Sequence, residues 1–108
     1  VALVTSSVDC DHTRHPIAER ALDPDRWHEV MVHTRPAHDG SGFLDLYLNG
    51  ELIGRHRGVM GYVCHGLGFI DTQPRFGLYR DAHPDAGPAT VYYDAIRFGA
   101  TREALQLK

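Results

Sequence analysis

The chain has 108 residues, of which 43% are hydrophobic and 23% are charged, and this composition is typical of a folded globular domain. It holds no apolar run as long as a membrane span, and its net charge of −3 provides no basic field for nucleic acid, so we expect neither a membrane nor nucleic acid as a partner. Ten of the eleven basic residues are arginines, whose planar guanidinium groups suit carboxylates and sulfates.

Short strands joined by turns are predicted along the first part of the chain. Residues 1–8 are apolar and β-branched enough for a strand, and residues 17–22 suit a short edge strand. Residues 27–34 carry apolar side chains on both faces, which is typical of a central strand. The alternation in that strand places His33 on the face opposite to Val32.

The clearest local signal is a hairpin at Asn49-Gly50, because both positions of a type I′ turn need positive φ. Alternating runs flank the turn at residues 43–48 and 51–55. The register that this turn predicts pairs Leu48 with Glu51, Leu46 with Ile53 and Leu44 with Arg55, leaving Asp45, Tyr47, Leu52 and His56 on the opposite side. The three leucines are therefore expected to form the core face.

A glycine-rich stretch leads into a polar strand. Residues 58–73 contain four glycines and no clean periodicity, which indicates a loop or lid. Residues 75–81 alternate as a strand, with Arg75 and Tyr79 on one face and only a glycine between them. A ligand would have room to lie between these two side chains.

The end of the chain predicts one more strand and a short helix. Residues 90–98 form a long strand in this interpretation, and residues 101–107 form one or two helical turns with Thr101 as the cap. With neither an internal repeat nor a long helix, residues 1–108 are expected to be a single all-β domain, a sandwich or jelly roll, or part of one.

Cysteine, histidine and aspartate residues leave alternatives open. Cys10 and Cys64 would form one disulfide in an oxidising compartment, or stay free and buried. Zinc-ligand types occur at spacings that match no standard zinc module, at Cys10, His12, His15, Cys64 and His65. Oxygen ligands for calcium occur without EF-hand spacing, at Asp9, Asp11, Asp81, Asp85 and Asp94. We expect no metal cofactor, with calcium as the alternative.

Four segments follow one another as Trp27–Val30, Gly42–Gly50, Arg75–Arg80 and Val91–Gly99. Together they resemble the C-terminal half of jelly-roll polysaccharide lyases of the heparin lyase I and alginate lyase type. The resemblance covers roughly residues 26–105, and its most specific part is Gly-x-Tyr-Arg followed by Tyr-Tyr-Asp. It implies a concanavalin A-like sandwich in a partial or reduced form, because few residues precede Trp27.

The resemblance also implies a function, the β-elimination of an acidic polysaccharide that contains uronic acid, by a secreted or periplasmic protein. Tyr79 matches the catalytic tyrosine of that family, and Arg75 occupies the position of a lysine while keeping its positive charge, so these are the candidate catalytic residues. Arg80 would contact the sugar carboxylate together with Arg75. The other candidate substrate contacts are His33, Tyr47 and His56.

Two rival interpretations remain open at the level of sequence. The first is a noncatalytic, lectin-like β-sandwich that binds carbohydrate but lacks a complete catalytic set. The second is a structural fragment, which would expose a hydrophobic sheet face. Taken singly, His33 and His56 also fit the role of surface or packing histidines.

Overall fold

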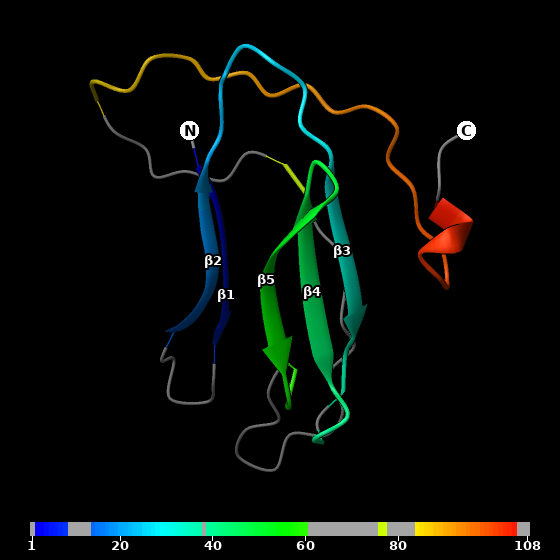
Figure 1. Cartoon of the computed structure of the whole chain (residues 1–108). Helices are drawn as coiled ribbons and strands as arrows, with labels where there is room; N and C mark the ends of the chain where they lie inside the picture. The colour runs from blue at the N-terminus through cyan, green and yellow to red at the C-terminus, as the bar shows by residue number, and fades with distance from the viewer. Residues whose placement is uncertain (1, 9–13, 38, 61–75, 78–83, 106–108) are drawn as a thin grey trace. The chain divides into compact units, whose positions relative to one another are not determined.

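A computed structural model describes residues 2–8, 14–37, 39–60, 76–77 and 84–105 (Figure 1). The chain forms two compact units, Val1–Thr72 and Gln73–Lys108. Among the described residues, the first unit contains five strands in two antiparallel sheets, and the second contains one short 3-10 helix. The predicted all-β class is therefore confirmed, whereas the concanavalin A-like jelly roll and its partial or reduced form remain predictions.

The smaller sheet pairs β1 (Ala2–Val8) with β2 (Arg14–Ala21). Both predicted strands are thus present, and β2 begins three residues earlier than expected. The register shifts between Thr5 and Ser6, where Ser6 lies opposite Pro16. Proline has no N–H to donate to a ladder, so an irregular pairing at this position costs the sheet little.

The larger sheet has the order β3 (Val30–Arg35), β4 (Phe43–Leu48) and β5 (Glu51–Arg57), with β4 in the middle (Figure 1). The prediction that residues 27–34 form a central strand is wrong for the sheet that the described residues form, since β3 lies at its edge and begins only at Val30. Trp27 precedes the strand and is 67% exposed, so it does not pack as an interior strand residue would.

The Asn-Gly hairpin is confirmed. Asn49 has a φ of 50° and Gly50 a φ of 83°, as a turn of this kind requires. Asn49 is also bound to the chain just before β3: its N–H donates to the Glu29 carbonyl at 2.8 Å, and its Oδ1 accepts from the Glu29 N–H at 2.9 Å. His28 Nδ1 lies 3.3 Å from Asn49 Nδ2, so both the oxygen and the nitrogen of the Asn49 side-chain amide have a partner.

Because of a bulge in β5, the observed register differs from the predicted one. Leu48 lies opposite Glu51 as expected, but the register shifts next to Leu46, which pairs with Gly54. Leu44 in turn pairs with His56, so the predicted pairs with Ile53 and Arg55 are wrong. One extra residue in a strand exchanges the faces of every residue beyond it, because side chains alternate with a period of two.

The two faces of the larger sheet follow from this register. One face, called here the leucine face, carries Val30, Val32, Thr34, Leu44, Leu46, Leu48, Glu51, Gly54 and His56. The other, called here the Asp45 face, carries Met31, His33, Arg35, Phe43, Asp45, Tyr47, Leu52, Arg55 and Arg57. The bulge therefore exchanges Arg55 and His56 relative to the prediction.

The core of the first unit lies on the leucine face. Leu46 is 2% exposed and is the only buried hydrophobic side chain among those described. Gly54, which pairs with it, lies against β2: a Cβ on Gly54 would stand 2.7 Å from the Ala18 Cβ and 3.1 Å from the Ile17 Cγ2. The glycine thus permits β5 and β2 to approach closely.

The second unit contains two segments that were predicted to be strands. Residues 90–98 form no strand: Ala95 has a φ of 52°, and its N–H binds the Asp94 carboxylate at 2.7 Å, a local bond that competes with strand pairing. The apolar side chains there stay exposed, with Tyr92 at 77% and Phe98 at 70%.

The other prediction concerns residues 75–81, of which only Phe76 and Gly77 are described. Neither lies in a strand, because the chain bends at Gly77 with a φ of 150°, and the rest of that stretch lies outside the described residues.

The helix predicted near the C-terminus is present as η1 (Glu103–Leu105). The Thr101 hydroxyl accepts a hydrogen bond from the Ala104 N–H at 3.2 Å, so its role as the cap is confirmed. No helix in the described part of the chain has the length and apolar character needed to cross a membrane.

Candidate functional site

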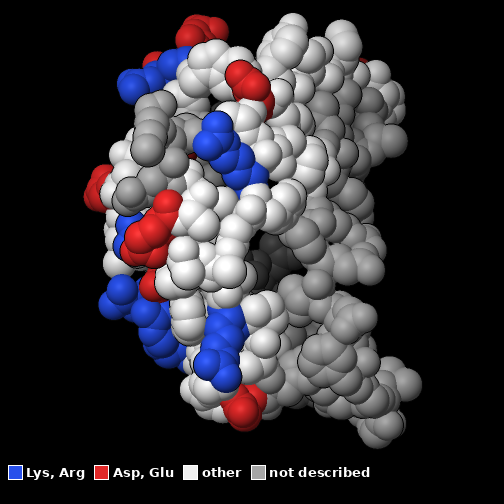
Figure 2. Space-filling model, turned by 90° about the vertical axis from the view of Figure 1, so that its right-hand side faces the viewer, with Lys and Arg blue, Asp and Glu red and all other residues white. Residues whose placement is uncertain are grey.

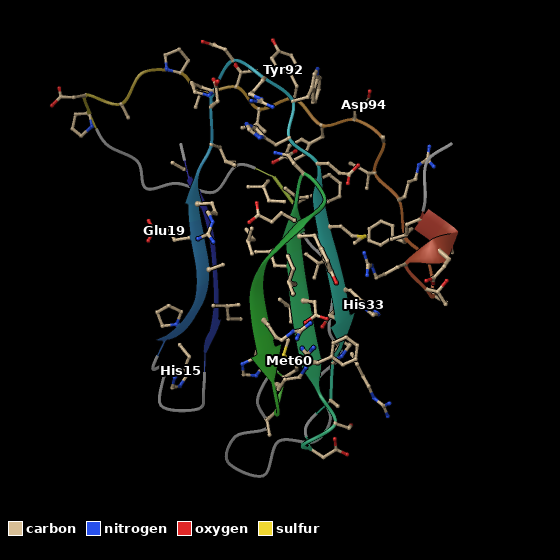
Figure 3. All side chains as sticks on the ribbon, viewed as in Figure 1. His15, Glu19, His33, Met60, Tyr92 and Asp94 are labelled. Atoms are coloured by element: carbon tan, nitrogen blue, oxygen red, sulfur yellow. The ribbon has the colours of Figure 1, made fainter. Side chains whose placement is uncertain are left out.

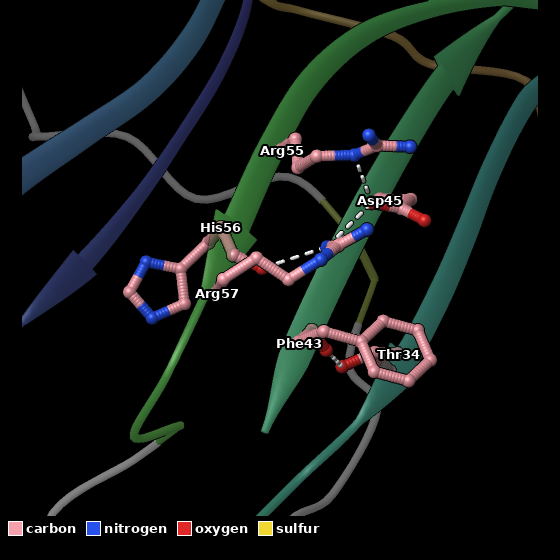
Figure 4. A network of polar contacts seen from close by, with 6 residues as sticks. All are labelled: Thr34, Phe43, Asp45, Arg55, His56 and Arg57. Carbon is pink, nitrogen blue, oxygen red and sulfur yellow. Dashed lines mark hydrogen bonds and ion pairs between the residues drawn. The ribbon is translucent and has the colours of Figure 1, made fainter. Parts of the chain in front are cut away.

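The centre of the Asp45 face is an aspartate held by two arginines (Figure 4). Arg57 donates from Nη1 to Asp45 Oδ1 at 2.7 Å, and Arg55 donates from Nε to the same oxygen at 3.0 Å. Arg55 stands directly opposite Asp45 across the ladder, and Arg57 is diagonal to it. Asp45 is only 6% exposed, so its charge is compensated by ion pairs in place of water.

The two guanidinium groups set the ionisation of this carboxyl. The hydrogen bond from Arg57 is the largest influence and lowers the pKa of Asp45, and Arg55 acts in the same direction. Burial alone would raise the pKa, and the two arginines outweigh it. Asp45 is therefore an anion at neutral pH.

An aromatic contact extends this cluster towards β3. The Arg57 guanidinium lies 5.2 Å from the centre of the Phe43 ring, within the range of a cation–π interaction. The ring of His33 meets the same ring edge-on, at 5.0 Å between centroids and an angle of 78°. Figure 3 shows His33 projecting from β3. The Asp45 face thus connects an imidazole, an aromatic ring and two cations.

The face carries more positive than negative charge. Its described side chains include three arginines, Arg35, Arg55 and Arg57, against the single aspartate. The Arg55 and Arg57 side chains remain 54% and 50% exposed, so they reach solvent while binding Asp45. Figure 2 shows basic and acidic side chains interspersed over the described part of the side in view. The excess of positive charge among the described side chains of the Asp45 face would attract an anion.

The structure brings together two of the predicted substrate contacts. His33 and Tyr47 both lie on the Asp45 face, and His33 pairs with Asp45 itself. His56 lies on the leucine face, and its Nε2 donates to the Val59 carbonyl at 3.0 Å. The prediction that His56 shares a face with Tyr47 is therefore wrong, because of the bulge at Ile53.

The remaining predicted site residues are Tyr79, Arg75 and Arg80, and all three lie outside the described residues. The same holds for Cys10 and Cys64, and so for their disulfide. The described part of the chain holds no cluster of three or more residues of the types that bind metals. Of the residues weighed for zinc or calcium, that part includes only His15, Asp85 and Asp94.

The sequence interpretation did not identify Asp45, Arg55 and Arg57 as one cluster. A signal was present, because two arginines two residues apart on a strand share a face, and the paired strand carries an aspartate. The predicted register, however, placed Arg55 opposite Leu44 and away from Asp45. The face of a charged residue cannot be assigned until the bulge is known.

Comparison with known proteins identifies a family. Residues 5–97 match the family model described as polysaccharide lyase. No significant match was found among curated proteins or among solved structures. The matched range includes all five strands, apart from the first three residues of β1, and therefore the whole Asp45 face.

Proposed function

Because the chain belongs to the polysaccharide lyase family, we propose that it cleaves a uronic acid-containing polysaccharide by β-elimination. The family match over residues 5–97 is the observation that carries this proposal. Within the family we assign the chain to the heparin lyase I and alginate lyase type, on the segments from Trp27 to Gly99 that resemble those enzymes. The proposal includes their concanavalin A-like sandwich and secretion or a periplasmic location.

β-Elimination needs three contributions from the protein. The carboxylate of the uronic acid must be neutralised, the proton on the adjacent carbon must be removed, and the departing glycosidic oxygen must receive a proton. The carbon–hydrogen and carbon–oxygen bonds break as a carbon–carbon double bond forms, so no oxidant or reductant is consumed. A protein therefore needs a cation beside the carboxylate and a group that transfers a proton.

We assign proton transfer to Tyr79 and carboxylate neutralisation to Arg75 and Arg80. A tyrosine with its ordinary pKa near 10 is a weak base at neutral pH, and a neighbouring guanidinium would make its ionised form easier to reach. Arginine suits the carboxylate because its planar N–H groups can donate two parallel hydrogen bonds.

We assign polymer contact to the Asp45 face. His33 and Tyr47 lie there beside exposed guanidinium groups, a combination that offers hydrogen-bond donors and rings to an acidic sugar chain. A polymer lying on this face would not reach the ring of His56, which lies on the leucine face. If His56 contacts the polymer, it contacts a part that extends beyond the Asp45 face.

The test of the reaction is the growth of ultraviolet absorbance from the unsaturated uronic product. The wild-type protein is incubated with alginate, heparin and glucuronan, and compared with Tyr79→Phe and with the control Tyr92→Phe, which alters an exposed tyrosine. Loss of a positioned proton-transfer group should lower the rate by about 10² to 10⁴. Equal rates for wild type and Tyr79→Phe would refute the role of Tyr79, and product from none of the polymers would refute the lyase assignment for these substrates.

A noncatalytic binding module is the second candidate function, and the composition of the Asp45 face favours it, because guanidinium and aromatic groups suffice to hold an acidic polymer without cleaving it. Equilibrium binding distinguishes the two. Measurable affinity for a polyuronate in a sample that forms no unsaturated product would establish a binding module. Product formation would establish the enzyme.

A further inference from the structure

The two arginines that bind Asp45, Arg55 and Arg57, have more hydrogen-bonding capacity than Asp45 uses. Arg55 donates to Asp45 through Nε, which leaves both terminal nitrogens of its guanidinium group for another acceptor. Arg57 uses Nη1 for Asp45 Oδ1 and for the His56 carbonyl, which leaves Nε and Nη2. Each arginine thus keeps a pair of N–H-bearing nitrogens beyond the bonds described.

The charge of the cluster is also not balanced. One carboxylate faces two guanidinium groups, so the group of three carries a net positive charge. Asp45 itself is covered, with a side chain 9% exposed, whereas both arginines are about half exposed. An anion approaching this face would therefore meet the cations and not the aspartate.

The arginines are held in place before any ligand arrives. Both are bound to the same oxygen of Asp45, and Arg57 also lies over the Phe43 ring. Fixing a long side chain in advance reduces the entropy that it loses when it binds, which raises affinity. A purely structural ion pair would need only one of the two arginines to compensate Asp45.

We infer that Arg55 and Arg57 form a clamp for the carboxylate of a uronic acid in the polysaccharide, with Asp45 as the residue that positions them. A planar carboxylate matches the paired N–H groups of a guanidinium better than a single hydroxyl does. The clamp rests on the proposed function, since the family supplies the polysaccharide, but it assigns recognition to residues separate from Tyr79 and Arg75.

The clamp is tested by equilibrium binding and by initial rates on a polyuronate and on the same polymer after reduction of its carboxyl groups. A sulfated, carboxyl-reduced polymer forms a third arm and separates carboxylate from sulfate recognition. The variants are Arg55→Gln and Arg57→Gln, with Arg55→Lys and Arg57→Lys keeping the charge without the planar group. The control is Arg20→Gln, which removes one positive charge from an exposed arginine on β2.

For the polyuronate, each glutamine variant should weaken binding about tenfold, as expected for loss of a charge-assisted hydrogen bond. The Michaelis constant should rise with kcat within about twofold, because the clamp holds the sugar chain in both the ground and the transition state. The lysine variants should lie between wild type and glutamine. The carboxyl-reduced polymer should bind about tenfold more weakly to wild type and equally to all variants.

The results separate the clamp from the proposed function. Wild-type affinity in both glutamine variants, or equal losses with the carboxyl-reduced polymer, would overturn the clamp and leave the lyase assignment intact. A tighter complex with the sulfated arm than with the polyuronate would also overturn it. Clamp-dependent binding without product would support the clamp and refute β-elimination. Absence of wild-type binding to every polyuronate would overturn both.

Folding is checked by circular dichroism and by thermal unfolding of each variant. If a glutamine variant is unfolded, the lysine variants decide the question, since they retain a cation beside Asp45. A lysine variant that is folded and binds the polyuronate as tightly as wild type would then overturn the clamp. Asp45→Asn supplies a further readout: as the loss of a positioning residue, it should raise the Michaelis constant and leave kcat within about twofold of wild type.

Discussion

Arg57 Nη1 and Asp45 Oδ1 lie 2.7 Å apart, and they belong to neighbouring strands of one sheet, not to the same strand. The bond therefore depends on the β4–β5 register. With Arg55 bound to the same oxygen at 3.0 Å, an aspartate that is 6% exposed can remain ionised. Without the bulge at Ile53, Arg55 and Arg57 would lie on the leucine face, and Asp45 would lose both partners.

Replacing Asp45 with asparagine should destabilise the fold in a pH-dependent way. Arg57 and Arg55 lower the pKa of Asp45, so its contribution to stability is present above the unfolded-state pKa of about 4 and is lost as the pH falls through the folded-state pKa. Asp45→Asn should cost about 1.5 to 3 kcal/mol near pH 7, the range for hydrogen bonds to charged groups.

The measurement is urea unfolding of wild type and Asp45→Asn across the acid range, with the exposed Asp25→Asn as the control. The difference between wild type and Asp45→Asn should shrink as the pH falls below about 4, because protonation removes the charge that the substitution also removes. A difference that stays constant from neutral to acid pH would contradict the ion pairs as its source. Asp25→Asn should change stability by less than about 0.5 kcal/mol.

Replacing Gly54 with alanine should loosen the contact between β5 and β2. The added Cβ would lie 2.7 Å from the Ala18 Cβ, closer than carbon atoms pack, so one strand must shift. We expect a loss of about 1 to 3 kcal/mol in the free energy of unfolding. Gly40→Ala is the matched control, because its Cβ would meet nothing within 4 Å.

A double-mutant cycle assigns that loss to the contact. Ala18→Gly removes the carbon atom that Gly54→Ala would strike, so the double variant should recover part of the lost stability. Recovery is expected to be incomplete, because the Ile17 Cγ2 would still lie 3.1 Å away. Strictly additive effects of the two substitutions would show that β5 and β2 do not meet at these residues in solution.

The hairpin and the bulge show what local sequence can and cannot predict. Asn49-Gly50 was predictable because positive φ at both residues is a property of the dipeptide itself. Ile53 carries no comparable mark of a bulge, and the shift it introduces depends on how β5 packs. Leu46 pairs with Gly54 across the ladder, and Gly54 also lies against Ala18, a tertiary contact that the sequence does not reveal.

In the second unit, local sequence predicted a strand that the structure does not contain. The apolar and aromatic residues in 90–98 predicted a strand from local propensity, but a strand needs a partner to satisfy its backbone groups. The bond from Ala95 N–H to the Asp94 carboxylate satisfies one of these groups locally and turns the chain at Ala95. For the site, the sequence named His33 and Tyr47 as substrate contacts, and the structure places both on the Asp45 face. The register error hid the arginine pair.

Asn49 should be more sensitive to alanine than to glycine. Alanine loses the Oδ1 acceptor of the Glu29 N–H and must also adopt a φ of 50°, whereas glycine loses only the acceptor. We expect Asn49→Ala to cost about 1 kcal/mol more than Asn49→Gly, the penalty of the left-handed conformation. Chemical denaturation of both variants provides the comparison, and equal stabilities would contradict the positive φ of this residue.

Phe43 should act on polymer binding through Arg57. The ring lies 5.2 Å from the Arg57 guanidinium carbon and contacts His33, so Phe43→Leu keeps an apolar side chain but removes the π face that holds the cation. If the clamp binds the polyuronate, Phe43→Leu should weaken binding by about two- to fivefold, since an exposed cation–π contact contributes about 0.5 to 1 kcal/mol.

The coupling between Phe43 and Arg57 separates this effect from a direct contact with the sugar. In an Arg57→Gln background the cation is already gone, so Phe43→Leu should then change the affinity little. Phe98→Leu, an exposed aromatic residue of the second unit, is the control for loss of a ring elsewhere. Losses that add fully in the double variant would mean that Phe43 contacts the polymer independently, as an aromatic platform for a sugar ring, and that Arg57 does not depend on it for its position.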